Sequence, residues 1–305
     1  MHQRSAFVLP AAALVVNAFI WGVSWWPFRE LQGLGLHPLW ATALVYGLVF
    51  SLLLTRFSSM LPHFARHPGL WALAIASGFT NVGFNWAVTV GDVVRVVLLF
   101  YLMPAWSVLV AWLLLGEKPT AGSLLRLVLA MAGVLVVLKT PESAWPIPSS
   151  LPDWLALAGG LSFALTNAYL RKLGNDNDSN KDSDVPSGAR MLAMFGGGAV
   201  LASGAALVGM GQGVVTAPAL ALSGLWVVAG LGLAFMVSNA SLQYGASRLP
   251  GGTTALIMLT EILFASGSAA WLGTAEFTPR IVWGGGLILL AALLSALAPA
   301  PDAVH

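Results

Sequence analysis

The chain has no cysteine among its 305 residues and very few charged side chains. The absence of cysteine excludes disulfide bonds and metal sites that are held by thiolates. Charged residues make up 9% of the sequence, whereas they make up about a quarter of a soluble domain. Because 58% of the residues are hydrophobic, the composition excludes an ordinary soluble globular protein.

Histidine is also scarce, and all five copies lie outside the long apolar runs, at His2, His37, His63, His67 and His305. An enzyme inside the membrane would need a cluster of His, Asp or Ser side chains there. A carrier of phosphates or nucleotide sugars would need paired Lys or Arg near the middle of the membrane, and the apolar runs hold none. We therefore expect no enzyme activity, no metal or other cofactor and no nucleic-acid partner.

Long apolar runs are what the sequence does have, and several exceed the roughly 18 residues that cross a ~30 Å hydrocarbon layer as a helix. The run at 6–27 is longer than the core of a signal peptide and contains Asn17, so it is interpreted as a span. The prediction is an all-α integral membrane protein with ten transmembrane helices. They cover residues 6–27, 38–56, 69–90, 92–115, 120–138, 152–172, 188–209, 222–245, 251–272 and 280–298.

An internal duplication organises the chain, because residues 81–117 recur in diluted form at 239–276. Each copy begins with two amides four residues apart and a following aromatic residue: Asn81, Asn85 and Trp86 in one, Asn239, Gln243 and Tyr244 in the other. Each copy ends with a tryptophan five residues before a glutamate, Trp112 with Glu117 and Trp271 with Glu276. The spacing predicts two five-helix repeats, 1–139 and 152–305, joined by a linker at 140–151.

The distribution of basic residues predicts the orientation. With the amino terminus inside, ten Lys and Arg lie on the cytoplasmic side and four on the other: Arg29, Arg95, Lys139 and Arg280. The positive-inside rule then places both termini in the cytoplasm. Because five spans is an odd number, the second repeat enters the membrane with the opposite polarity. Inverted repeats around a central cavity are typical of secondary transporters, which bind substrate near the midplane.

Three short motifs resemble the EamA-type transporters of the drug/metabolite transporter superfamily: Trp21-Gly22, WLLLGEKPT at 112–120 and its echo WLGTAEFTP at 271–279. The resemblance extends over all ten predicted helices. It implies two inverted five-helix halves around a central cavity and transport of small metabolites, often outward. Within the family, FYLMPAWSVL at 100–109 is most similar to the aromatic amino acid exporters, which have Tyr-Leu-x-Pro in the fourth helix.

The sequence also departs from that pattern. Family members often carry glutamate directly before the proline of the fourth or ninth helix, whereas here Met103 precedes Pro104. In the second repeat, Glu261 lies two residues before Leu263, and the proline is missing. An ion-coupling residue therefore cannot be transferred directly from the family to this chain.

Polar side chains within the predicted spans are candidates for lining the cavity, because an unsatisfied polar group in hydrocarbon costs several kcal/mol. The alternative is that each amide only forms a hydrogen bond between helices. Amides and aromatic residues recur at helical spacing in the first and sixth spans as well. The predicted substrate-binding residues are Asn17, Trp21, Asn81, Asn85, Trp86, Tyr101, Phe163, Asn167, Asn239, Gln243 and Glu261.

Three further positions carry specific expectations. Pro104 is the predicted hinge, since a proline there kinks the helix and frees the Phe100 carbonyl for a substrate amine. Glu261 is the one carboxylate near the centre of a span, either a proton carrier and ammonium acceptor or a protonated hydrogen-bond donor between helices. Asp92 and Arg95 are expected to form a solvated pair at the outer rim.

These observations predict an inner-membrane exporter of small amphipathic metabolites that works by alternating access, with aromatic or neutral amino acids as the leading substrates. A cavity of amides and aromatic rings with few fixed charges suits a net-neutral zwitterion. The alternative is proton-coupled export of hydrophobic cations through Glu261. The expected partners are the small-molecule substrate and membrane lipid, and a monomer is compatible with the sequence.

Overall fold

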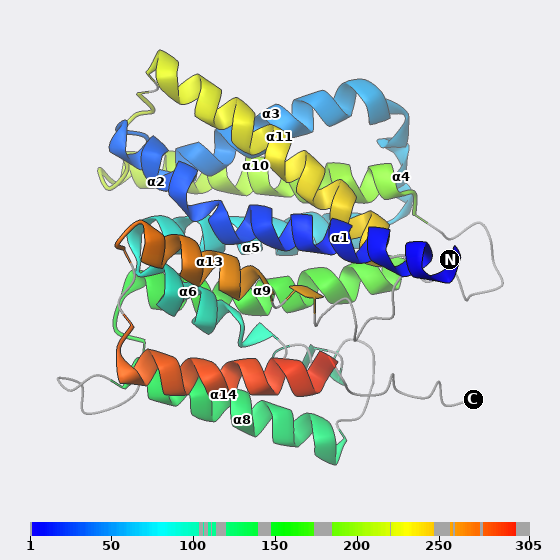
Figure 1. The fold of residues 1–305 in the computed structure, drawn as a ribbon. Helices are drawn as coiled ribbons and strands as arrows, with labels where there is room; N and C mark the ends of the chain where they lie inside the picture. The colour runs from blue at the N-terminus through cyan, green and yellow to red at the C-terminus, as the bar shows by residue number, and fades with distance from the viewer. Residues whose placement is uncertain are drawn as a thin grey trace.

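The computed structural model describes residues 2–103, 106, 109–110, 112–113, 120–139, 148–173, 185–219, 221–246, 257–258, 260–274 and 277–296. All regular structure in these residues is helical (Figure 1). The helices are α1 (His2–Val23), α2 (Trp25–Gly33), α3 (Pro38–Phe57), α4 (Pro62–Arg66), α5 (Gly69–Val90), α6 (Val93–Phe100), α8 (Ala121–Leu138), α9 (Leu151–Leu173), α10 (Ser187–Gly211), α11 (Leu222–Ala246), α13 (Thr260–Trp271) and α14 (Pro279–Ala296), with a 3-10 turn at Ser58–Met60.

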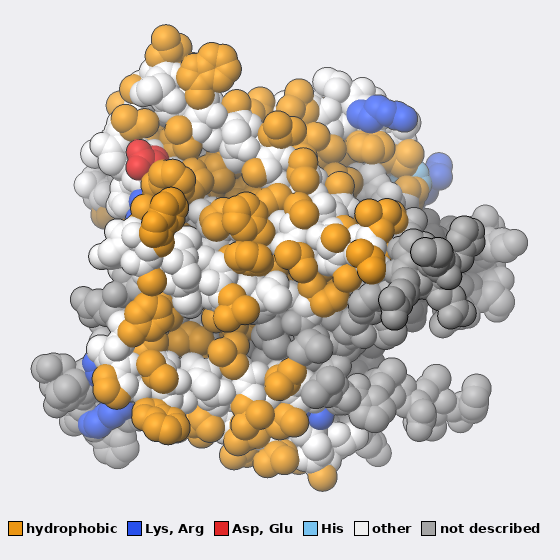
Figure 2. Space-filling model, in the orientation of Figure 1, with side chains coloured by type: hydrophobic (Ala, Val, Ile, Leu, Met, Phe, Trp, Pro, Cys, Tyr) orange, Lys and Arg blue, Asp and Glu red, His pale blue; other side chains and the backbone are white. Residues whose placement is uncertain are grey.

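Four of these helical segments are long and apolar enough to cross a membrane: Val8–Gly33, Pro38–Met60, Ser187–Gly211 and Leu222–Leu242. Helix α5 has a comparable 22 residues but carries Asn81 and Asn85 among its apolar residues. Hydrophobic side chains spread over the middle of the face in Figure 2, whereas its few charged side chains lie toward the ends of the helices. The chain is therefore a membrane protein with several apolar helices.

The first predicted span ends in the wrong place. Helix α1 stops at Val23, and the chain continues beyond a turn at Ser24 as α2 to Gly33 instead of ending at residue 27. The Ser24 hydroxyl donates a hydrogen bond to the Trp21 carbonyl over 2.9 Å. A serine that bonds back to its own helix in this way bends the helix, which explains the change of direction.

Local capping explains several of the other boundaries. His37 precedes Pro38 at the start of α3, and its Nδ1 accepts a hydrogen bond from the Leu39 amide over 3.2 Å. Burial lowers the pKa of His37, which keeps this nitrogen free to accept. Gly35, Gly213 and Gly273 each follow a helix with positive φ, the conformation that glycine adopts without strain.

Helices from distant parts of the chain pack side by side in the bundle. Helix α5 packs against α9 and α10, α3 against α10, and α1 against α11 and α13. Helix α8 packs against α14 at one edge of the bundle, as Figure 1 shows. The first and second halves of the chain are therefore interleaved rather than separate.

The α8–α14 contact is reciprocal. A Cβ on Gly133 would lie 2.6 Å from the Gly284 carbonyl oxygen, and a Cβ on Gly284 would lie 2.7 Å from the Gly133 carbonyl oxygen. Only residues without a side chain allow two helix backbones to approach so closely.

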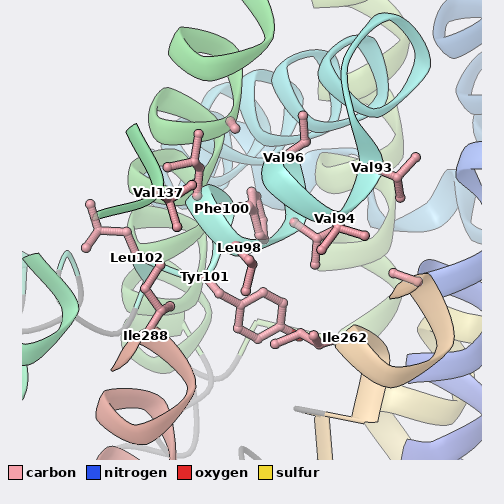
Figure 3. Close-up of a cluster of buried hydrophobic side chains, with 14 of the residues drawn as sticks. Val93, Val94, Val96, Leu98, Phe100, Tyr101, Leu102, Val137, Ile262 and Ile288 are labelled. Atoms are coloured by element: carbon pink, nitrogen blue, oxygen red, sulfur yellow. The ribbon is translucent and has the colours of Figure 1, made fainter. Parts of the chain in front are cut away.

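The largest buried cluster lies around α6, where it joins α8, α13 and α14. Figure 3 shows Tyr101 at the end of α6 with its ring directed toward Ile262 of α13. Val93, Leu98 and Leu99 of α6 are also almost fully buried. This packing fixes the end of α6, the segment that presents Phe100 and Tyr101 to the rest of the bundle.

Candidate functional site

Tyr101 and Glu261 form a buried polar contact between the two halves of the chain. The Tyr101 hydroxyl donates a hydrogen bond to Glu261 Oε2 over 2.9 Å and lies 3.1 Å from the Met258 carbonyl oxygen. The side chains are 6% and 7% exposed, so both polar groups are removed from the lipid. A buried carboxyl is costly unless it is neutral or hydrogen-bonded, which the tyrosine provides here.

Gly22 explains how α1 comes so close to this contact. A Cβ on Gly22 would lie 2.8 Å from the Glu261 carbonyl oxygen and 2.7 Å from Phe264 Cβ. The missing side chain lets α1 cross α13 directly at Glu261, while the preceding Trp21 enters the aromatic interior. The Trp-Gly pair noted in the sequence thus has a packing role at the candidate site.

Beside the Tyr101–Glu261 contact, aromatic rings from five helices form a series in which each ring contacts the next. Trp21 of α1 stacks on Phe235 of α11 with centroids 4.8 Å apart, and meets Phe84 of α5 edge-on at 5.9 Å. Phe84 contacts Phe100 of α6 at 4.8 Å, and Phe100 contacts Phe163 of α9 at 5.6 Å. Offset and edge-on geometries of this kind are the favourable ones for aromatic pairs.

The series includes residues that the sequence did not identify. Phe84, Phe100 and Phe235 were not predicted as site residues, although Phe84 precedes Asn85 and Phe100 precedes Tyr101. Phe235 also contacts Tyr46 of α3 at 5.6 Å, and Tyr46 contacts Phe195 of α10 at 5.5 Å. Phe84 and Phe100 are thus adjacent in sequence to predicted residues, whereas Phe235 is not.

Asn17 is engaged between helices. It is fully buried, and its Nδ2 donates to the Ser238 carbonyl over 2.9 Å and to the Ser238 hydroxyl over 2.6 Å. Its Oδ1 has no hydrogen-bond partner among the described residues. The contact links α1 to α11 one turn away from the Trp21–Phe235 stack.

Asn85 is also fully buried and has a similar arrangement. Its Nδ2 lies 3.4 Å from the Thr42 hydroxyl of α3, and its Oδ1 has no partner in the part of the chain that is described. Both amides therefore use their nitrogen to join helices and retain an oxygen that can accept a hydrogen bond.

The other predicted residues have more varied environments. Asn81 is buried in α5, and Asn239 is half-buried in α11. Asn167 Nδ2 lies 4.0 Å from Met103 Sδ. Trp86 lies apart from the aromatic series, since its ring meets His37 at 5.3 Å. The side chain of Gln243 lies outside the described part of the structure, as do Pro104, Glu117 and Glu276.

Two expectations from the sequence need correction. The Phe100 carbonyl packs on α9, since a Cβ on Gly160 would lie 2.6 Å from its oxygen, so it is not held open for a substrate amine. The Asp92–Arg95 pair does not form through the side chains: Asp92 accepts a hydrogen bond from the Arg95 backbone amide and caps α6. The Arg95 side chain instead pairs with Asp153 at 2.7 Å.

No group of three His, Asp or Glu side chains within the described ranges could hold a metal ion. The polar chemistry of the candidate site is therefore that of one carboxyl, one phenol and a few amides against aromatic rings. Such a set can bind and orient an amphipathic ligand by hydrogen bonds and ring contacts.

The apolar helices and the buried contacts between them define a polytopic helical membrane protein. Residues 9–139 match the EamA-like transporter family, so this part of the chain is similar to a transporter domain. Members of this family are transporters rather than enzymes. No curated protein gives a significant match.

Fifteen chains of solved structures match the fold. One of them, described only as the crystal structure of a protein, is 16% identical with a TM-score of 0.57. The alignment covers 95% of this chain and 96% of that chain. The likeness shows that the fold as a whole, beyond residues 9–139, occurs in a known structure.

Proposed function

We propose that the protein is a secondary transporter of the inner membrane, built from two inverted halves, 1–139 and 152–305, that alternate in access to a site between them. The support comes from equivalent helix contacts. Let α1, α3, α5, α6 and α8 of the first half correspond, in this order, to α9, α10, α11, α13 and α14 of the second. The contact between α5 and α9 then has an equivalent between α11 and α1, and the contact between α6 and α9 has one between α13 and α1. Helices α3, α6 and α8 each pack against their own counterparts.

Glycine contacts repeat under the same exchange. Gly22 of α1 packs on the Glu261 carbonyl, and Gly160 of α9 packs on the Phe100 carbonyl. Gly133 and Gly284 pack on one another. A two-fold axis in the membrane plane that relates the halves accounts for all three contacts.

The aromatic series supports the proposed substrate class. Trp21, Phe84 and Phe100 come from one half of the chain, and Phe163 and Phe235 come from the other. A ligand held there contacts both halves, as alternating access requires. Rings and neutral amides suit small molecules with an apolar or aromatic side chain and no net charge. We infer that aromatic or neutral amino acids are exported, with both termini of a monomer in the cytoplasm.

A second candidate is favoured by the Tyr101–Glu261 contact. A carboxyl beside aromatic rings attracts a cation by charge and by cation–π interaction. Proton-coupled export of hydrophobic cations would use Glu261 as the group that exchanges a proton for the substrate.

Transport by purified protein in liposomes distinguishes the candidates. Radiolabelled phenylalanine and tryptophan are compared with tetraphenylphosphonium, each with and without a pH gradient. Amino acid transport that Trp21→Ala weakens and Trp154→Ala leaves unchanged supports the first candidate, because the Trp154 ring is 60% exposed on the surface. Cation transport that follows the pH gradient supports the second. Transport of neither class, with the protein correctly folded, would overturn both substrate assignments.

A further inference from the structure

Arg95 and Asp153 join the two halves at one edge of the bundle. Arg95 lies in the first turn of α6 and Asp153 in the first turn of α9. Arg95 Nε donates to Asp153 Oδ1 over 2.7 Å, and Nη2 donates to Oδ2 over 3.0 Å. The third nitrogen, Nη1, donates to the Val137 carbonyl at the end of α8 over 2.9 Å. One guanidinium therefore holds three helix ends together by a two-point carboxylate contact and a carbonyl contact.

Further contacts hold the segments next to Arg95 and Asp153 in place. Asp153 Oδ2 also accepts a hydrogen bond from the Ser149 amide, just before α9. The Arg29 side chain of α2 donates to the Val88 and Gly91 carbonyls at the end of α5. A Cβ on Gly91 would lie 2.6 Å from Pro152 Cβ, so the α5–α6 turn is packed directly on the start of α9.

The pair has the properties of a contact that can open. Its side chains are 18% and 2% exposed, so it lies where the bundle interior meets water. While α6 and α9 are in contact, a substitution that removes one of the two side chains leaves the other charge without its counterion. When α6 and α9 separate, water hydrates both charged groups, so breaking the ion pair costs little free energy in the open state.

The sequence does not repeat this pair in the second half. The internal duplication aligns Arg95 with a threonine, Thr253 or Thr254. The counterpart of Asp153 falls in α1, whose sequence contains no acidic residue. An ion pair that is present at one edge and not at the other biases the equilibrium between the two access states, because it stabilises only one of them.

We propose that Arg95 and Asp153 form a gate latch that holds this edge closed and opens when the transporter exposes its site there. The proposal rests on the alternating-access function proposed above. The latch sets the resting state, whereas the aromatic site binds the substrate.

Cysteine accessibility tests the latch, because the native chain contains no cysteine. The reporter is Val88→Cys, a buried position in α5 whose carbonyl Arg29 binds. Its rate of reaction with a hydrophilic maleimide is measured in liposomes. We expect Arg95→Met or Asp153→Asn to raise the rate by about fivefold or more, because each variant increases the population of the open state, in which the cysteine is accessible. The charge-swapped pair Arg95→Asp with Asp153→Arg should bring the rate back toward that of the parent.

Arg280→Met is the matched control, since Arg280 also binds a carbonyl of the first half, that of Lys139, but outside the α6–α9 contact. It should leave the reporter rate unchanged. An unchanged rate in the Arg95 and Asp153 variants, or an equal rise in the control, overturns the latch. A swapped pair that labels as fast as the single variants also overturns it.

A second measurement covers variants that fold poorly. Arg95→Cys with Asp153→Cys, joined by a short bifunctional maleimide, should stop transport in the otherwise intact chain. Continued transport by the cross-linked protein would contradict the proposal. If the parent protein transports nothing, the proposed function fails; if it transports but the latch variants leave both readouts unchanged, only the latch fails.

Discussion

Tyr101 and Glu261 stand 160 positions apart in the sequence and share a 2.9 Å hydrogen bond inside the bundle. Tyr101 follows the last residue of α6 and Glu261 lies in the first turn of α13, and both side chains are buried. A movement that separates the halves must break this bond or replace it by a contact with the substrate. The bond is thus placed to couple the state of Glu261 to the conformation of the protein.

Removing the titratable group tests that coupling. Glu261→Gln keeps the size of the side chain and an oxygen that can accept the Tyr101 hydroxyl, so the variant should fold. We expect its transport to lose the pH dependence that the parent shows between about pH 5 and 8, since no proton can bind at this position. Initial rates in liposomes at matched internal and external pH measure it. Identical pH profiles for variant and parent would reduce Glu261 to a structural hydrogen-bond partner.

The amides allow a site role to be separated from a structural one. Asn85→Ala and Asn239→Ala should weaken efflux of phenylalanine or tryptophan by about ten- to a hundredfold, as expected for loss of a ~1.5–3 kcal/mol hydrogen bond to a charged substrate group. Membrane expression should stay intact. Normal export by both variants would remove these residues from the site.

Asn17 should behave differently, because its Nδ2 donates two short hydrogen bonds to Ser238 of α11, at 2.9 and 2.6 Å, whereas Asn85 Nδ2 lies 3.4 Å from the Thr42 hydroxyl. We expect Asn17→Ala to lower the free energy of unfolding by about 1–2 kcal/mol, the range for hydrogen bonds between membrane helices. Thermal unfolding in detergent measures this loss. A variant with parental stability and impaired transport would place Asn17 with the substrate instead.

The helix positions could be predicted largely from the sequence, because apolar length is a local property. The predicted 69–90 coincides with α5, and 38–56, 152–172 and 222–245 lie within two residues of α3, α9 and α11. The bend at Ser24 was missed, since one serine in an apolar run does not interrupt the hydropathy. Whether each of the ten predicted segments crosses the membrane stays a prediction.

The contacts at the candidate site could be predicted only in part. Trp21, Tyr101, Phe163 and Glu261 were predicted and lie in or beside the aromatic series. Phe84, Phe100 and Phe235 were missed because a helix that is apolar all round does not indicate which face points inward. Arg95 was assigned to Asp92 because the two are close in sequence, whereas its partner is 58 residues away. Long-range pairing depends on helix packing, which a single sequence does not specify.

The reciprocal glycine contact predicts a difference in stability between neighbouring glycines. Gly133→Ala and Gly284→Ala would each place a Cβ against a backbone carbonyl, and we expect a loss of about 1–3 kcal/mol from overpacking. Gly286→Ala is the control on the same helix as Gly284, because a Cβ at that position would meet nothing within 4 Å. It should be neutral or stabilising, since alanine favours a helix by up to about 1 kcal/mol over glycine. Equal melting temperatures for all three variants would contradict the packing.

The charge distribution predicts the topology independently of the site. Cysteines introduced at Ser179, in the polar sequence 174–187, and at Ala303, near the carboxyl terminus, should both resist impermeant thiol reagents in intact cells. They should react once the membrane is permeabilised. Labelling of either position from outside would reverse the proposed orientation, and would place the edge with Arg95 and Asp153 on the cytoplasmic side.

Gly22 offers a test of whether the α1–α13 crossing serves the site rather than stability alone. Gly22→Ala directs a methyl group at the Glu261 carbonyl and Phe264, so α13 must shift and the Tyr101–Glu261 bond should weaken. Gly47→Ala in α3 is the matched control, since its Cβ would meet nothing within 4 Å. We expect Gly22→Ala to alter the pH profile of transport in the same direction as Glu261→Gln, and Gly47→Ala to keep the parental profile. A Gly22→Ala variant that loses only stability, with parental transport and pH profile at low temperature, would show that the glycine merely permits close packing.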